Sequence, residues 1–288
     1  MTDFSWPPGY RAAAAFTFDV DAESAVLADH PDAASRMSVM THQAYGPRTG
    51  VPRILRILEH RGVRGTFFVP GYTAELHPAA IAAIRDAGHE IGHHGYLHEP
   101  PHLATAEQEE ANLLRGLEAL ERTVGIRPSG YRAPWWEATY RTPGLLAKHG
   151  FRYDSSLMDA DRPYRLAVDG EPGAPSIIEI PIHWGLDDWE QYGFLPGLTG
   201  SGVIESPAKA LEMWSAELDA LAAEGGCFVI TMHPFLSGRA SRALVLDRLI
   251  ARAREIPGLW ITTLDEIARH TDTLDLEPVA HRPPPLPA

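Results

Sequence analysis

The segment RAAAAFTF, residues 11–18, decides the fold of this chain, and it runs directly into Asp19-Val20-Asp21. An almost continuous apolar run of this length is typical of a buried strand. Shorter runs of the same kind follow along the chain, and each predicts a further strand: residues 65–70, 89–93, 127–131, 176–182, 227–232 and 259–262. The strand with the acidic ending is therefore the first of about seven.

Helical patterns separate these strands. Residues 51–61 have apolar side chains at helical spacing, and Gly62 ends that helix. A capping box, Thr105-x-x-Gln108, opens a long helix over residues 105–124. Further helices are expected at 78–87, 142–149, 206–224 and 242–255, and after a capped start at Thr263-x-x-Glu266.

Two long connections, residues 22–50 and 183–205, are expected to be irregular and to serve a site. The alternation of strands and helices, without a change of composition between the halves, indicates one α/β domain with a parallel sheet. A β/α barrel is the expected shape. In such barrels the chemistry lies at the C-terminal ends of the strands.

Composition excludes several classes of protein. Hydrophobic residues make up 44% and charged residues 22% of 288, which is typical of a globular chain. The formal net charge is −13, from 25 Lys and Arg against 38 Asp and Glu, so neither nucleic acid nor a membrane surface is an expected partner. Because Cys227 is the single cysteine and residues 1–11 lack a signal-peptide pattern, a cytoplasmic location is expected.

Two motifs at predicted strand ends suggest a metal site. Residues two apart in an extended segment point to the same side, so Asp19 and Asp21 can face one spot beyond the first strand. His94 and His98 follow the strand at 89–93, and their imidazoles can converge on one ion if the segment is helical or tightly turned. Each motif also has an ordinary explanation, since acidic loops and incidental histidines are common. Carboxylate and imidazole together suit Zn²⁺ and similar cations.

Two more strand ends carry single polar residues. Arg132 stands beside Pro134, Trp135 and Trp136, where it can hold a carboxylate or simply pack. His233 follows the strand at 227–232 and can act as a general acid, or be a capped or buried histidine. The four strand ends thus offer a carboxylate pair, a histidine pair, an arginine and a single histidine. Coincidence explains such a set poorly.

These motifs together resemble those of the polysaccharide deacetylases of carbohydrate esterase family 4. The matching segments are TFDVD at 17–21, HGYLH at 94–98, RAPWW at 132–136 and MHP at 232–234. The resemblance implies a distorted (β/α)7-type barrel as a single catalytic domain, within residues 1–270, followed by a Pro-rich tail at 271–288. It also implies a divalent metal, usually Zn²⁺, held by Asp21, His94 and His98.

The same resemblance implies a role for each remaining motif residue. Asp19 would be the base that activates water, and Arg132 would orient Asp19. His233 would protonate the leaving nitrogen, and the backbone N–H of Trp135 would help to hold the oxyanion.

The sequence also departs from the common family pattern. Val20 separates the two acids, which are adjacent in most members, and Gly95 follows His94 where Ser or Thr is usual. FDVDAES, with the segments at 154–164 and 179–189, is similar to a cytoplasmic branch that includes an atypical peptidoglycan deacetylase and allantoinase-like cyclic amide hydrolases. Members of that branch tend to form homotetramers, so a homo-oligomer is expected.

The expected substrate is a small linear or cyclic amide or an N-acetylated sugar, and the expected reaction is hydrolysis of a non-peptide C–N bond. The alternative is a degenerate barrel that binds a sugar or metal without catalysis. Aromatic residues are expected to line the cleft and to bind substrate, or else to pack in the core or between subunits: Trp135, Trp136, Trp184, Trp189, Tyr164 and Tyr192.

Overall fold

The computed structural model describes residues 4–168, 175–200 and 202–286, and it contains one nine-stranded sheet. Seven strands are parallel neighbours. Their order across the sheet is β10 (Cys227–Met232), β1 (Ala12–Asp19), β2 (Thr66–Val69), β3 (Glu90–His93), β4 (Gly130–Tyr131), β5 (Tyr153–Asp154) and β7 (Ser176–Glu179). The sequence predicted six of them and missed the two-residue β5, while the seventh predicted strand, at 259–262, pairs at the side of β1.

Two further strands complete this sheet. β6 (Tyr164–Ala167) pairs antiparallel with β7, and β11 (Leu259–Ile261) pairs parallel with the start of β1. A separate two-stranded ribbon joins β8 (Phe194–Leu195) to β9 (Thr199–Gly200). Short strands of this kind lack a strong apolar run, which is why β6 escaped the sequence reading.

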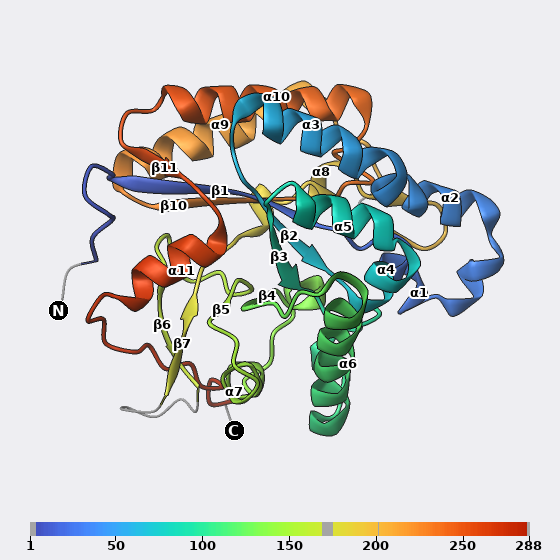
Figure 1. Ribbon diagram of the computed structural model, residues 1–288, viewed down its shortest axis with the longest axis horizontal. Coiled ribbons are helices and arrows are strands. Elements are labelled where there is room, and N and C mark those ends of the chain that lie inside the picture. Colours follow the sequence, from blue (N-terminus) through green and yellow to red (C-terminus); the bar gives the residue numbers. More distant parts are fainter. Residues whose placement is uncertain (1–3, 169–174, 201, 287–288) are drawn as a thin grey trace.

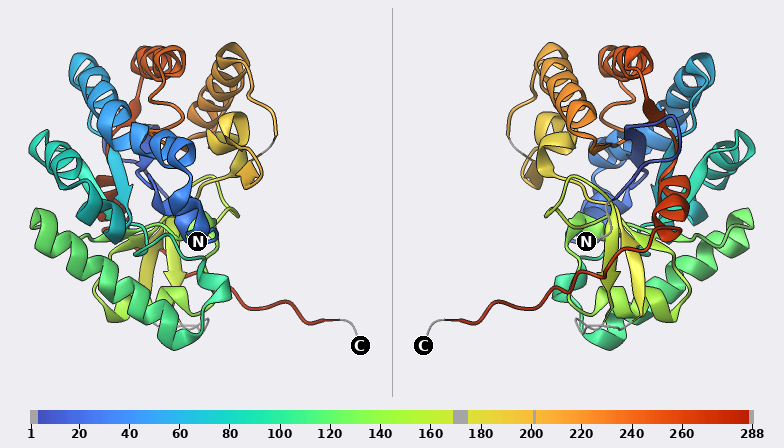
Figure 2. Two further views of the ribbon diagram at one scale, coloured as in Figure 1. Left: turned by 90° about the vertical axis from the view of Figure 1, so that its right-hand side faces the viewer. Right: turned by 90° about the vertical axis from the view of Figure 1, so that its left-hand side faces the viewer.

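Helices surround the outside of the curved sheet (Figures 1 and 2). The longer ones are α2 (Met37–Tyr45), α3 (Val51–Arg61), α5 (Pro78–Asp86), α6 (Ala106–Val124), α9 (Pro207–Glu224), α10 (Ala240–Glu255) and α11 (Leu264–Asp272). Shorter helices are α1 (Ser24–Leu27), α4 (Gly71–Leu76), α7 (Thr142–Lys148) and α8 (Trp189–Tyr192).

The barrel is incomplete, which agrees with the distorted (β/α)7 type. Within the described ranges no ladder joins β6 to β10. The free edge of β10 is instead met by the connection after β7, through a single bridge between Asp187 and Thr231. The backbone N–H of Asp188 also donates to the carbonyl of Thr231, at 3.1 Å. A loop therefore occupies the position of the missing barrel wall.

Strand β1 is buried on both faces because it lies between the helices and the barrel interior. Its even-numbered residues, such as Phe16 and Phe18, belong to the core beneath the surrounding helices. Ala13 and Ala15 pack on the opposite face, against residues from β5, β7 and α11. The alternation continues to Asp19, which therefore faces the interior at the open end of the strand.

Some sequence expectations need correction. The connection at 22–50 is not irregular throughout, because it contains α1 and the nine-residue α2. Helix α2 makes no side-chain cap and shows little amphipathic patterning, so its sequence carried no helix signal. The capping box at Thr105 forms as predicted. The one expected at Thr263 does not, since Glu266 accepts from the Thr262 hydroxyl instead.

The expected boundary at residue 270 falls within the last turn of α11. Beyond it, Val279 donates to the carbonyl of Arg165 and accepts from the N–H of Ala167, so part of the tail lies along β6. Whether residues 271–288 are a separate unit stays a prediction. Within the described residues, no helix combines the length and the apolar character needed to cross a lipid bilayer.

We predict that Gly116→Ala on α6 destabilises the protein by about 1–3 kcal/mol. In a helix interior this change is worth roughly 1 kcal/mol of stabilisation by propensity alone. An added Cβ would, however, lie 2.3 Å from His93 Nε2 and 2.6 Å from the carbonyl oxygen of Gly95. Urea unfolding measures the change, with the exposed Leu114→Ala on the same helix as a control of near-zero effect. A variant as stable as the parent would contradict this packing.

Candidate active site

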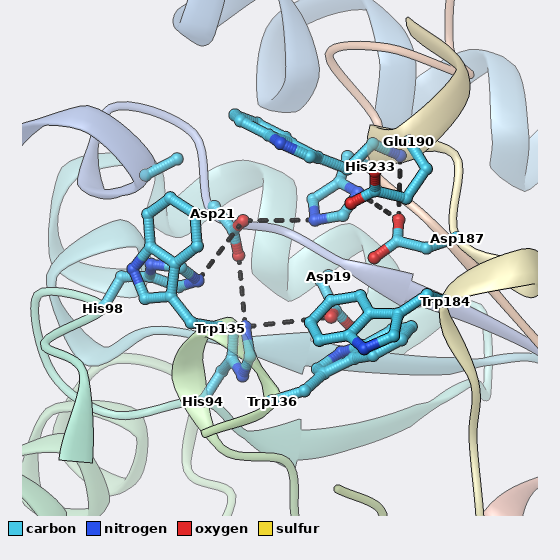
Figure 3. A pocket seen from close by; sticks show the side chains of 12 residues that line it. Asp19, Asp21, His94, His98, Trp135, Trp136, Trp184, Asp187, Glu190 and His233 are labelled. Carbon is cyan, nitrogen blue, oxygen red and sulfur yellow. Dashed lines mark hydrogen bonds and ion pairs between the residues drawn. The ribbon is translucent and has the colours of Figure 1, made fainter. Parts of the chain in front are cut away.

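Three of the four polar strand ends meet in one cavity of about 160 Å³ (Figure 3). Asp19 ends β1 and Asp21 follows two residues later, while His94 directly follows β3 and His233 directly follows β10. Arg132, which follows β4, lies behind Asp19. The cavity is lined by Asp19, Asp21, Ala25, His94, His98, Trp135, Trp136, Trp184, Asp187, Trp189, Glu190 and His233.

Asp21, His94 and His98 form a compact group of potential metal ligands. One donor atom from each lies within 4.8 Å of the others, and all three side chains are buried. Asp21 Oδ1 is 3.5 Å from His94 Nε2, and Asp21 Oδ2 is 3.6 Å from His98 Nε2. The segment between the histidines is a tight turn rather than a helix, with φ of +72° at Gly95 and +64° at His98.

Glycine is required at the start of that turn. A Cβ at residue 95 would lie 2.9 Å from Pro134 Cγ, and the positive φ is unfavourable for other residues. This gives a physical reason for Gly95, at a position where Ser or Thr is usual in the family that the sequence resembles.

The ligand group fits a divalent cation. His94 Nδ1 donates to the carbonyl of Arg132 at 2.8 Å, which leaves Nε2 with its lone pair toward Asp21. Burial lowers the pKa of His98 well below its usual range, so this imidazole is neutral. Asp21 Oδ1 is buried and has no hydrogen-bond partner among the described residues. A carboxylate and two imidazoles, one with a backbone partner, are ligands typical of zinc and related metals.

Arg132 holds Asp19 from behind the cavity. Its Nη1 donates to Asp19 Oδ1 at 2.9 Å, and both side chains are buried. Burial raises the pKa of Asp19, but the attraction of Arg132 and the nearby histidines outweighs it, so the net pKa lies below the usual range. Asp19 is therefore an anion. The pKa of Asp21 instead lies above its usual range, because burial outweighs its histidine neighbours.

His233 lies on the other side of Asp21, with Nε2 at 3.4 Å from Asp21 Oδ2. Its Nδ1 is 2.7 Å from Asp188 Oδ1, and Asp188 also accepts from the His233 backbone N–H. Burial alone lowers the pKa of His233, but the surrounding carboxylates, Asp187 first, raise it well above its usual range.

Asp187 and Asp188 are functional candidates that the sequence reading missed. Asp187 lines the cavity, 3.5 Å from His233 Nδ1, and burial raises its pKa to about 8. With His233 these acids form a second group of metal-ligand type. The two acids already accept hydrogen bonds from the protein. His233 Nδ1 donates to Asp188, and the backbone N–H of Trp189 donates to Asp187. The sequence signal that could have identified them is that two adjacent acids stand in the aromatic-rich connection at 183–205.

Four indoles wall the cavity, as the sequence predicted for Trp135, Trp136, Trp184 and Trp189. The rings of Trp136 and Trp184 stack, with centroids 4.7 Å apart. The other two expected aromatics are not brought to this cavity. The Tyr164 hydroxyl donates to Asp159 at 2.8 Å, and Tyr192 is buried against Trp214.

The backbone around the cavity is strained. Among the described residues, positive φ occurs at four that are not glycine, and all of them adjoin this site: Ala22, His98, Trp135 and Trp136. Such conformations cost roughly 1–3 kcal/mol each and persist where surrounding contacts enforce them. Strain of this kind is common at functional sites.

Comparisons with known proteins agree with this arrangement. A family model described as polysaccharide deacetylase matches residues 31–153. A peptidoglycan deacetylase of Helicobacter pylori is 33% identical over 282 residues, which cover 88% of this chain and 94% of that protein.

Solved structures extend the likeness to the whole chain. A Mycobacterium smegmatis protein provisionally classed as a polysaccharide deacetylase is 52% identical, with 99% of both chains covered and a TM-score of 0.96. The allantoinase PuuE is 26% identical, with 93% of this chain and 92% of that chain covered and a TM-score of 0.80. The chain therefore belongs to the polysaccharide deacetylase family, and it is a hydrolase that acts on carbon–nitrogen bonds other than peptide bonds.

Proposed function

We propose that this protein is a metal-dependent amide hydrolase in which Asp21, His94 and His98 hold a divalent cation, with Zn²⁺ as the native ion. The buried ligand group flanked by Asp19 and His233 carries the proposal. A divalent cation there supplies Lewis-acid polarisation of the substrate carbonyl and lowers the pKa of the attacking water.

Asp19 acts as the general base. It is anionic, lies within 3.8 Å of His94 and lines the cavity, so it can take a proton from the attacking water. Arg132 fixes the position of this carboxylate by its hydrogen bond to Oδ1, which leaves Oδ2 toward the ligand group.

His233 acts as the general acid. Because Nδ1 is engaged by Asp188, Nε2 is the nitrogen that faces the cavity and can deliver a proton to the leaving amine. The neighbouring carboxylates favour the protonated imidazole that this role needs. The backbone N–H of Trp135 helps to hold the oxyanion. A barrel that only binds its ligand would need neither a separate base nor a separate acid.

The cavity favours a small amide as substrate. Its volume of about 160 Å³ and its four indoles suit a single flat ring or a short amide better than a polymer strand. The likeness to an allantoinase supports a cyclic amide. The likeness to the H. pylori peptidoglycan deacetylase favours the second candidate, deacetylation of an N-acetylated sugar. A homo-oligomer and a cytoplasmic location stay predictions.

Metal analysis distinguishes the two acidic groups. We expect about one divalent ion per chain in the dialysed protein, and none in Asp21→Ala, because that change removes the only anionic ligand. Asp187→Asn is the matched control and should keep its ion, since Asn closely resembles a protonated Asp187. Mass spectrometry of the metals measures both. Loss in Asp187→Asn with retention in Asp21→Ala would refute the assigned ligands.

Asp19→Asn tests the general base. The variant should keep its metal and lose about 10²- to 10⁴-fold in turnover, because an amide cannot accept the proton of the attacking water. Asp29→Asn, at an exposed acid, should turn over like the parent. Steady-state rates and metal content are measured on the same samples. Unchanged turnover in Asp19→Asn would disprove its role.

Parallel substrate panels test the reaction. Cyclic imides and ureides such as allantoin should be opened without acetate release, and chelation should abolish this activity. Acetate release from N-acetylglucosamine oligomers would establish the second candidate instead. Turnover that survives complete removal of the metal would contradict the metal-dependent mechanism.

A further inference from the structure

Two buried carboxyl groups lie behind the active site and take no part in the mechanism above. Asp154 ends β5 and Glu179 ends β7, and the two are direct partners in the parallel ladder. Both are fully buried, and neither is among the residues that line the catalytic cavity. Buried acids are costly to keep, so their contacts need an explanation.

The two acids hold one short segment of chain. Asp154 Oδ1 accepts from the backbone N–H of Ser155 at 2.8 Å and from the hydroxyl of Ser156 at 2.6 Å. Glu179 Oε1 accepts from the backbone N–H groups of Ser156 at 3.1 Å and Leu157 at 2.9 Å. Four hydrogen bonds thus fix residues 155–157.

That segment in turn holds the arginine motif. Arg132 Nε donates to the carbonyl of Ser155 and Nη2 to its hydroxyl, both at 3.1 Å. The backbone N–H of Ala133 donates to Ser156 Oγ at 2.9 Å. Ser156 Oγ therefore links Asp154 directly to the backbone of the motif, since it donates to the acid and accepts from Ala133.

The arginine motif that these contacts hold includes strained backbone. Two and three residues after Ala133, Trp135 and Trp136 adopt φ of +60° and +57°. Arg132 must also keep its alignment on Asp19. A rigid hydrogen-bonded backing is a physical means of holding both the strained turn and the guanidinium.

The protonation behaviour of Asp154 and Glu179 is consistent with a supporting role. Burial raises the pKa of Asp154 to about 6, and burial together with Asp154 raises that of Glu179 well above its usual range. Asp154 Oδ2 and Glu179 Oε2 have no other hydrogen-bond partner among the described residues, which suits a proton shared between them. The groups that face the pair are Arg132, Tyr131, Tyr164 and Ser156.

We propose that Asp154 and Glu179 are positioning residues, which act through Ser155 and Ser156 to hold Arg132 against Asp19 and the Trp135 N–H toward the substrate carbonyl. This inference rests on the proposed function, because it assigns support for the same base and the same oxyanion contact.

Asp154→Ala should lower kcat by roughly 10- to 100-fold while KM changes by less than about threefold, because misaligned catalytic groups affect the chemical step more than binding. The metal content should stay unchanged, since no assigned ligand is altered. Asp154→Asn keeps the Oδ1 acceptor and can donate to Glu179, so it should retain kcat within about threefold.

Glu90→Ala is the matched control. Glu90 is also a carboxyl with a raised pKa from burial, and it accepts from Thr66, Tyr153 and the Asp265 N–H at the opposite end of the sheet. It should lose thermal stability without a comparable loss of kcat. Equal losses of kcat in Glu90→Ala and Asp154→Ala, or in Asp154→Asn and Asp154→Ala, would overturn the proposal.

Ser156→Ala provides a milder change if Asp154→Ala fails to fold. It removes only the hydroxyl between Asp154 and Ala133, and it should lower kcat about tenfold without loss of metal. Hydrogen exchange gives a readout independent of turnover: the amide of Ala133 should exchange faster in Ser156→Ala than in the parent. Unchanged exchange at Ala133 overturns the positioning role alone, whereas a parent without metal-dependent turnover overturns the proposed function.

Discussion

The active site depends on the buried ion pair between Arg132 and Asp19. Besides Asp19, the guanidinium donates to Thr17 on β1, Thr231 on β10 and Ser155 after β5, so one side chain ties together four strand ends. A buried ion pair offsets its desolvation only when its remaining hydrogen-bonding groups are satisfied. Here the partners are supplied by neighbouring strands of the parallel sheet. The position of Asp19, the proposed base, is thus a property of the sheet rather than of a loop.

Chemically similar groups acquire opposite properties within this small space. Asp19 and Asp21 are two residues apart, yet their pKa values are shifted in opposite directions. Arg132 and the nearby histidines bring the pKa of Asp19 below its usual range, whereas burial raises that of Asp21. His98 and His233 are likewise both buried, but only His233 has carboxylates around its ring. Neighbouring charges therefore favour the neutral form of His98 and the protonated form of His233. Residue type alone does not assign these roles.

Sequence patterns predicted the parts of the site that follow from local order. Asp19, His94, Arg132 and His233 each come directly at the end of a strand, and parallel strands bring such ends together. Asp188 was missed because it lies inside the connection after β7, where no predicted strand end places it beside His233. Tyr164 was expected at the cleft, but it lies on the antiparallel strand β6. This strand was not predicted because its sequence contains no apolar run.

The connection after β7 contributes to two parts of the site. It brings Trp184 and Trp189 to the cavity wall, and it also supplies both carboxylates beside His233. A remodelled loop that admits a different substrate would consequently alter the surroundings of His233, the proposed acid, as well. Under the proposed mechanism, substrate selectivity and proton delivery therefore depend on the same loop. A loop sequence that changes the substrate would then have to preserve Asp187 and Asp188, while the strand-end residues could stay unchanged.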